Sequence, residues 1–115
     1  MRWMLRGKIH RATVTQTRLE YEGSITVDID LLEKAGIWVG EMVWIANVSN
    51  GARFETYALE GERNSGVVAL NGAAARLCSV NDKIIIMGYE LTNEPIKAKV
   101  VTVDDDNKAV KEFTY

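Results

Sequence analysis

Short apolar and polar stretches alternate along the chain, in a pattern that favours β-strands over long helices. Residues 4–14 alternate between two faces, with Lys8 and His10 on one face and Ile9 on the other. Other runs of branched and aromatic residues, bounded by turn residues, also predict strands. They span residues 24–29, 42–48, 52–61, 66–70, 82–91 and 97–104. The run at 82–91 is nearly all apolar, so we expect it to be buried on both faces.

Two short helices interrupt the strands. The segment DIDLLEKAG offers Asp28 or Asp30 as N-cap and Gly36 as the residue after the last turn. The alanine-rich residues 71–80 predict a second short helix, whereas the charged residues from about 104 to 115 predict a loosely ordered tail. Short strands with two small helices favour a mainly β fold, a small closed β-barrel, formed by one domain over residues 1–115.

Composition excludes several classes of function. The 115 residues carry a net charge of −2, so no nucleic-acid partner is indicated, and no apolar run could span a membrane. One histidine and one cysteine give no metal site, and no phosphate-binding glycine loop is present. The single Cys78 lies among apolar residues and predicts a buried structural thiol in a reducing cytoplasm.

The stretch LEYEGSITVD raises the question of chemistry. Glu22, Gly23 and Ser24 would make an acceptable turn between two strands. A Gly-Ser bond can also be one that a protein cuts in itself, and the local sequence leaves both interpretations open.

Four segments decide between them. MLRGKIHRATVT, YEGSITVD, NGARFETYA and LNGAAARL, in this order between about Met4 and Glu90, resemble the signature segments of the aspartate 1-decarboxylase family. The resemblance implies a double-psi β-barrel, a homotetramer with active sites between subunits, and a pyruvoyl cofactor. It further implies decarboxylation of L-aspartate to β-alanine and CO2, for the synthesis of pantothenate and coenzyme A.

The resemblance also implies how the cofactor forms. The Ser24 hydroxyl attacks the Gly23 carbonyl, and elimination and hydrolysis then leave a pyruvoyl group at residue 24. The products are a β-chain of residues 1–23 and an α-chain of residues 24–115. Thr56 would donate a hydrogen bond to the oxygen of the intermediate.

Substrate residues follow from the same resemblance. The amine of aspartate forms a Schiff base with the pyruvoyl ketone, and Tyr57 protonates the carbanion left by CO2. Arg53 offers a planar fork for the side-chain carboxylate, and Lys8 and His10 add positive potential. Asn71 would hydrogen-bond the pyruvoyl region or the intermediate of the cleavage. A carboxylate cradle of backbone N–H groups would come from Gly72, Ala73 and Ala74.

Two details do not fit simply. Thr56 and Tyr57 are adjacent, so a regular strand points them to opposite faces, unless a bulge intervenes or they serve neighbouring sites across a subunit boundary. Family members often carry a tryptophan seven residues before the arginine, where this chain has Ala46, with Trp44 two residues earlier.

Two other functions remain as alternatives. One is a non-catalytic barrel that binds small molecules or partners and never cuts Gly23-Ser24. The other is a pyruvoyl decarboxylase for a different amino acid, although Arg53 with Lys8 favours a substrate with a second carboxylate. Whether the cut is spontaneous or needs a maturation factor stays open at this point.

Overall fold

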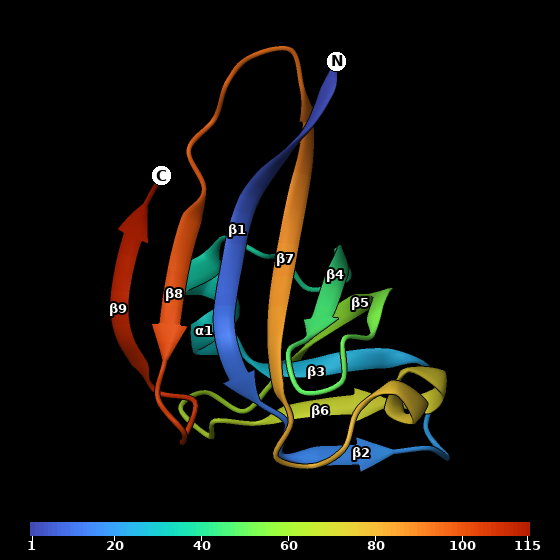
Figure 1. Cartoon of the computed structure of the whole chain (residues 1–115). Coiled ribbons are helices and arrows are strands. Elements are labelled where there is room, and N and C mark those ends of the chain that lie inside the picture. The colour runs from blue at the N-terminus through green and yellow to red at the C-terminus, as the bar shows by residue number, and fades with distance from the viewer.

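The computed structural model describes residues 1–115 and consists mainly of β-strands (Figure 1). The strands are β1 (Arg2–Thr13), β2 (Gln16–Arg18), β3 (Ser24–Asp28), β4 (Met42–Asn47), β5 (Arg53–Gly61), β6 (Val68–Asn71), β7 (Lys83–Thr92), β8 (Lys99–Val103) and β9 (Ala109–Thr114). The two short helices are α1 (Ile29–Ala35) and the 3₁₀ helix η1 (Gly72–Leu77). The predicted mainly β class with two short helices is confirmed.

The order of paired strands leads from β2 to β1, which are consecutive in the chain, so the pairing returns to the segment where it began. The order is β2-β6-β3-β5-β4-β7-β1-β8-β9, and only Val14 and Thr15 separate β1 from β2 in the chain. The Thr15 amide donates to the Val68 carbonyl over 2.8 Å, so the β1–β2 segment joins β7 on one side to β6 on the other. This ring of strands agrees with a barrel, while its double-psi connectivity stays a prediction.

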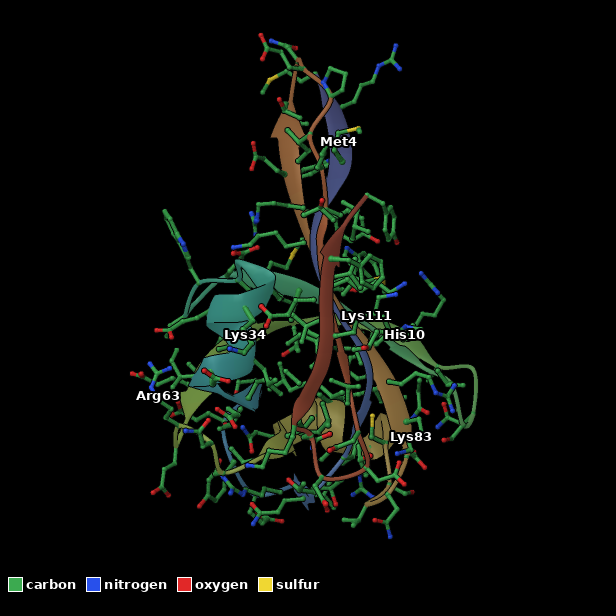
Figure 2. The ribbon with its side chains drawn as sticks, turned by 90° about the vertical axis from the view of Figure 1, so that its left-hand side faces the viewer. Met4, His10, Lys34, Arg63, Lys83 and Lys111 are labelled. Carbon is green, nitrogen blue, oxygen red and sulfur yellow. The ribbon has the colours of Figure 1, made fainter.

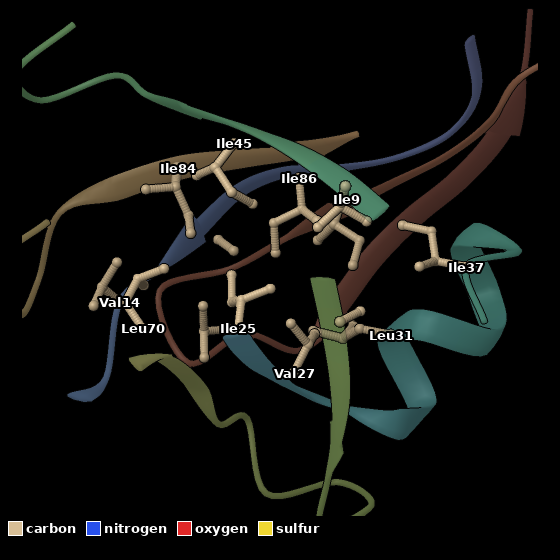
Figure 3. Close-up of a cluster of buried hydrophobic side chains, with 14 of the residues drawn as sticks. Ile9, Val14, Ile25, Val27, Leu31, Ile37, Ile45, Leu70, Ile84 and Ile86 are labelled. Atoms are coloured by element: carbon tan, nitrogen blue, oxygen red, sulfur yellow. The ribbon is translucent and has the colours of Figure 1, made fainter. Parts of the chain in front are cut away.

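The core lies inside this ring. Figure 3 shows branched side chains from separate strands, among them Ile9, Ile25, Ile45 and Ile86, converging in one cluster. All four are fully buried. Because burial of apolar surface is the main favourable term in folding, this cluster fixes which face of each strand points inward.

Helix α1 packs against β1 and β8 and has the predicted caps. The Asp28 carboxylate accepts a hydrogen bond from the Asp30 amide, and Gly36 ends the helix in the left-handed conformation at φ 67°. Leu31 and Leu32 point into the core. The local sequence signals for this helix were therefore sufficient.

The C-terminal segment differs from the prediction of a loose tail. Residues 109–114 form β9, which pairs antiparallel with β8. The buried Asn107 anchors the turn before it: its Oδ1 accepts from the Thr13 amide, and its Nδ2 donates to the carbonyls of Thr13 and Gly66. The pairing with β8 and this buried amide together order a segment that has no strong apolar pattern.

Strand β7 is less buried than predicted. Ile84 and Ile86 are fully buried, whereas Ile85 and Met87 on the other face are only half-buried. The strand is therefore not buried on both faces, because its outer face is left uncovered in a single chain.

Strands β1 and β7 run beyond the rest of the molecule as a projecting arm (Figure 1). Figure 2 shows Met4 on this arm, above the level of α1. No helix in the structure has the length and apolar character needed to cross a membrane.

Candidate active site

The Gly23–Ser24 bond lies where residues 19–23, the 19–23 loop, enter β3. Ser24 is the first residue of β3 and is 1% exposed. Strand β6 separates β2 from β3, with Asn71 paired to Arg18 on one side and to Ser24 on the other. The 19–23 loop therefore passes over the end of β6.

Asn71 holds the serine hydroxyl. Its Nδ2 donates to Ser24 Oγ over 2.8 Å and to Thr26 Oγ1 over 2.9 Å. Asn71 is 2% exposed, and its Oδ1 is buried without a hydrogen-bond partner. Such unpaired buried acceptors are rare in folded proteins, and a catalytic role is one of the explanations for them. The structure thus brings Asn71 to Ser24, and its role toward the pyruvoyl region or the cleavage intermediate stays a prediction.

Gly72 allows η1 to approach the 19–23 loop closely. Its φ is +69°, and a Cβ there would lie 2.8 Å from the Tyr21 carbonyl oxygen and 2.9 Å from Gly23 Cα. Both the conformation and the space require glycine. Ala73 is exposed and Ala74 is half-buried on η1, and the carboxylate cradle predicted for these residues stays a prediction.

Strand β5 lies on the other side of β3. The two strands are parallel with Ile25 beside Ala58, and continuing this register backwards places Tyr57 beside Ser24 and Thr56 beside Gly23. Tyr57 is 40% exposed, so its phenol is open to solvent in a single chain. The predicted roles of both residues are compatible with these positions.

The β4–β5 register is continuous, so the bulge considered for Thr56 and Tyr57 is absent. Thr56 pairs with the buried Val43, and Tyr57 pairs with the exposed Met42. The two residues therefore face opposite sides of the sheet. The bulge is therefore ruled out, and which site each of the two residues serves stays a prediction.

Arg53 is not close to Ser24 in the same chain. It precedes Tyr57 by four residues on an extended strand, which is about 13 Å. It lines a pocket that includes neither Ser24 nor Asn71. The pocket residues are Trp3, Glu41, Met42, Trp44, Arg53 and Tyr89.

Lys8 and His10 lie on the same outer face as Arg53. Lys8 pairs with Met87, which pairs in turn with Trp44 of the pocket. His10 is at an irregularity of β1, next to Arg11, whose φ is 62°. Across β8, the row of paired residues that starts at His10 continues through Thr102 to Lys111 of β9.

Positive charge and burial act together on His10. Desolvation lowers the pKa of its imidazole first, and the charges of Lys8 and Arg11 lower it further. Its Nδ1 is buried without a partner. His10 is therefore biased toward the neutral form, so the predicted positive potential comes mainly from Lys8 and Arg53.

Cys78 belongs neither with the residues around Ser24 nor with Arg53, Lys8 and His10. It is a free, buried thiol that receives a 3.6 Å contact from Asn47 Nδ2, and burial raises its pKa to about 11. A thiol with so little thiolate at neutral pH is a poor nucleophile, so the predicted structural role is confirmed.

The structure thus sorts the predicted residues into two groups. Gly23, Ser24, Asn71 and Gly72 surround the bond in question, with Tyr57 and Thr56 beside it by register. Arg53, Lys8 and His10 lie apart, on the outer face. No sequence pattern indicates the contact of Arg18 with the 19–23 loop, where its guanidinium lies 5.1 Å from the ring centre of Tyr21. None indicates the pocket residue Trp3 either, because the arm that carries it has no motif.

Comparisons with known proteins give one family. The sequence model described as "Aspartate decarboxylase" matches residues 1–110. A protein named aspartate 1-decarboxylase from Lactiplantibacillus plantarum is 58% identical over 97% of this chain and 89% of its own length. Proteins of the same name from Neisseria meningitidis and Thermoanaerobacter pseudethanolicus are 60% and 52% identical, covering 99% and 95% of this chain and 93% and 97% of their own lengths.

Proposed function

The chain belongs to the aspartate decarboxylase family, and on this premise we propose that it cuts its own Gly23–Ser24 bond and then decarboxylates L-aspartate to β-alanine and CO2. β-Alanine made in this way serves pantothenate and coenzyme A synthesis. The observation that carries the proposal is the buried Ser24 hydroxyl held by Asn71 at the entry to β3.

Self-cleavage needs only atoms of the chain and one water molecule. Ser24 Oγ attacks the Gly23 carbonyl carbon, the peptide C–N bond breaks, and an ester forms while the Ser24 proton moves to the nitrogen. Loss of the Cα proton of residue 24 then breaks the Cβ–Oγ bond, and Gly23 leaves as a carboxylate. Water hydrolyses the resulting enamine to the pyruvoyl group and releases ammonia.

The surrounding residues assist the first step. The amide of Asn71 fixes the position of Ser24 Oγ, and Gly72 lets the loop lie close enough for attack. Thr56, beside Gly23 by register, donates to the oxygen that becomes negative as the tetrahedral carbon forms. No metal is needed for these roles.

The pyruvoyl group fits the position of Ser24. It supplies a ketone that accepts the electron pair left behind when CO2 departs. The chain supplies the remaining functions: Tyr57 stands beside residue 24 by register and gives a proton to the substrate Cα, and the N-terminal end of η1 faces the same region.

The carboxylate-binding part of the site comes from a second subunit. Arg53 has no ion-pair partner and lies about 13 Å along β5 from the level of Ser24, too far to hold an aspartate that reacts there. We therefore assign Arg53, with Lys8, to the Ser24 site of a neighbouring copy in a homotetramer. The exposed apolar residues Trp3, Met42 and Trp44 around Arg53 support an interface on this face.

Intact-mass measurement of the purified protein, combined with a β-alanine assay, tests the proposal. We expect chains of residues 1–23 and 24–115, the larger without a free N-terminal amine, and β-alanine formed from aspartate. One uncut chain would favour the non-catalytic barrel, and a free serine amine at residue 24 would mean cutting by a protease. The Ser24→Ala variant should stay uncut and inactive.

The same preparation addresses two open points. Conversion of purified, uncut chain without any added protein would show that no maturation factor is required. A panel of amino acids with and without a second carboxylate identifies the substrate. The free thiol of Cys78 agrees with the reducing cytoplasm that we propose as the location.

A further inference from the structure

The 19–23 loop has few contacts that could hold it in place. All of its residues are exposed, and Tyr21 is 59% exposed. One backbone hydrogen bond, from the Tyr21 amide to the Arg18 carbonyl over 3.3 Å, closes its first turn. Exposed segments with few buried contacts are the least stable parts of a fold. Presentation of the Gly23 carbonyl to Ser24 Oγ therefore requires a further restraint on the loop.

The side chain of Arg18 contacts this loop directly. Its guanidinium carbon lies 5.1 Å from the centre of the Tyr21 ring, within the range of a cation–π interaction. Gln16, on the same face of β2, accepts a hydrogen bond from the Arg18 Nη2 and orients the guanidinium. Glu20 and Glu22 lie nearby in the sequence, yet Arg18 forms no ion pair with either. The ring of Tyr21 is thus the partner that Arg18 holds.

The contact between Arg18 and Tyr21 lies at the start of the loop that leads to Ser24. Arg18 and Ser24 lie on the two sides of Asn71, across β2-β6-β3. The loop between them rests on Gly72, whose missing Cβ would collide with the Tyr21 carbonyl and with Gly23. Contact with Arg18 therefore fixes Tyr21 and restrains the peptide segment from Tyr21 to Gly23, whose carbonyl is the one attacked.

We propose that Arg18 is a positioning residue for self-cleavage, which acts by stacking on Tyr21 and so holding the 19–23 loop in the conformation that presents Gly23 to Ser24 Oγ. This inference rests on the proposed self-cleavage and extends it to a residue outside the reacting atoms. Attack within a chain depends steeply on the near-attack geometry, so restraint of a loosely held loop accelerates it.

The test measures how fast freshly synthesised chain is cut. Samples taken over time are run on a denaturing gel, which separates cut from uncut chain. Arg18→Gln removes the cation but keeps a polar side chain, and should slow cutting roughly two- to fivefold, the range for an exposed cation–π contact. Arg18→Lys and Tyr21→Phe keep the cation and the ring, and should cut at nearly the rate of the unmodified chain. Tyr21→Leu should slow cutting as much as Arg18→Gln, and the double variant should be no slower than either single variant.

Two controls separate positioning from folding. Arg76→Gln removes the same charge from the exposed end of η1 without touching Tyr21, and should leave the rate unchanged. In a Ser24→Ala background, which stays uncut, Arg18→Gln should leave the midpoint of thermal unfolding unchanged.

The outcomes are distinguishable. Equal cutting rates for Arg18→Gln and the unmodified chain would overturn this inference and leave the proposed function intact. Slower cutting accompanied by a lower unfolding midpoint would also overturn it, because Arg18 would then support the fold. An unmodified chain that is never cut would overturn the proposed function itself.

Discussion

The side-chain amide of Asn71 donates a hydrogen bond to the hydroxyl of Ser24 over 2.8 Å, across two antiparallel strands. The donor comes from the last residue of β6 and the acceptor from the first residue of β3. This contact fixes the nucleophile beside the bond that it is proposed to attack. The Oδ1 of the same amide is buried without a partner, which costs stability.

Asn71→Ala should therefore slow self-cleavage. The net contribution of one hydrogen bond corresponds to roughly a three- to tenfold change in rate. The measurement is the fraction of cut chain with time after synthesis, and Asn93→Ala, an exposed asparagine without hydrogen bonds, serves as control. Cutting at an unchanged rate would mean that the amide only packs against Ser24.

Tyr57→Phe should separate cutting from turnover. Because the phenol is assigned to protonation of the substrate and not to attack on Gly23, the variant should be cut normally. Its kcat should fall by about 10²-fold, the scale typical of a general acid. Tyr115→Phe, at the exposed C-terminus, is the matched control. Nearly normal turnover would assign the proton to water or to another residue.

Arg53→Lys should lose selectivity for a second carboxylate. Lysine keeps the charge but lacks the planar fork, so kcat/KM for L-aspartate should fall about 30- to 1000-fold. The fall should be far smaller for alanine, which has no side-chain carboxylate to hold. Both substrates are measured after complete cutting has been verified. An equal fractional loss for both would mean that Arg53 supports the fold or the maturation step.

Mixed oligomers test whether two subunits share a site. Ser24→Ala lacks the group formed at residue 24, and Arg53→Ala lacks the carboxylate fork, so each alone should be nearly inactive. Coexpression should restore activity in about a quarter of the sites of a random one-to-one mixture. Absence of recovery, in oligomers shown to contain both chains, would place Ser24 and Arg53 in the same subunit's site.

Asn107→Ala should destabilise the fold without touching the site. The substitution removes three hydrogen bonds and leaves the amide and carbonyl of Thr13 and the carbonyl of Gly66 without their partner. The free energy of unfolding should fall by about 2–4 kcal/mol, measured with denaturant in the Ser24→Ala background at matched protein concentration. Asn93→Ala should change it little. An equal effect of both variants would mean that the turn at Asn107 does not hold the tail.

Helix α1 shows what the sequence could predict. Its start at Asp28 and end at Gly36 depend on residues within one turn, and both caps are found in the structure. The inward faces of the strands could be predicted for the same reason, since alternation is local. β9 could not be, because its order depends on Asn107 contacting Thr13, on a distant strand.

The site was predictable as a set of residues but not as an arrangement. The four motifs resemble one family, yet nothing in their order along the chain says that β4 and β5 carry Arg53 away from Ser24. That separation follows from the strand order, which is set by long-range pairing. The incomplete burial of Ile85 and Met87 could not be predicted either. The apolar residues of β7 include an outer face that a single chain does not cover.

The hydrogen bond between Asn71 and Ser24 joins residues 47 positions apart in the chain. The serine and the carbonyl it attacks are neighbours in sequence, but the amide that aligns them arrives only after β6 has paired with β3. A nascent or misfolded chain lacks this alignment as well as the restrained 19–23 loop, and it should be cut far more slowly than a folded chain. Since the cut is irreversible, the proportion of cleaved molecules in a preparation is a cumulative covalent record of how many chains have folded correctly. A denaturing gel can then report folding yield, long after folding has finished, for any variant that retains the residues that control cutting, which are Arg18, Tyr21, Ser24, Thr56, Asn71 and Gly72.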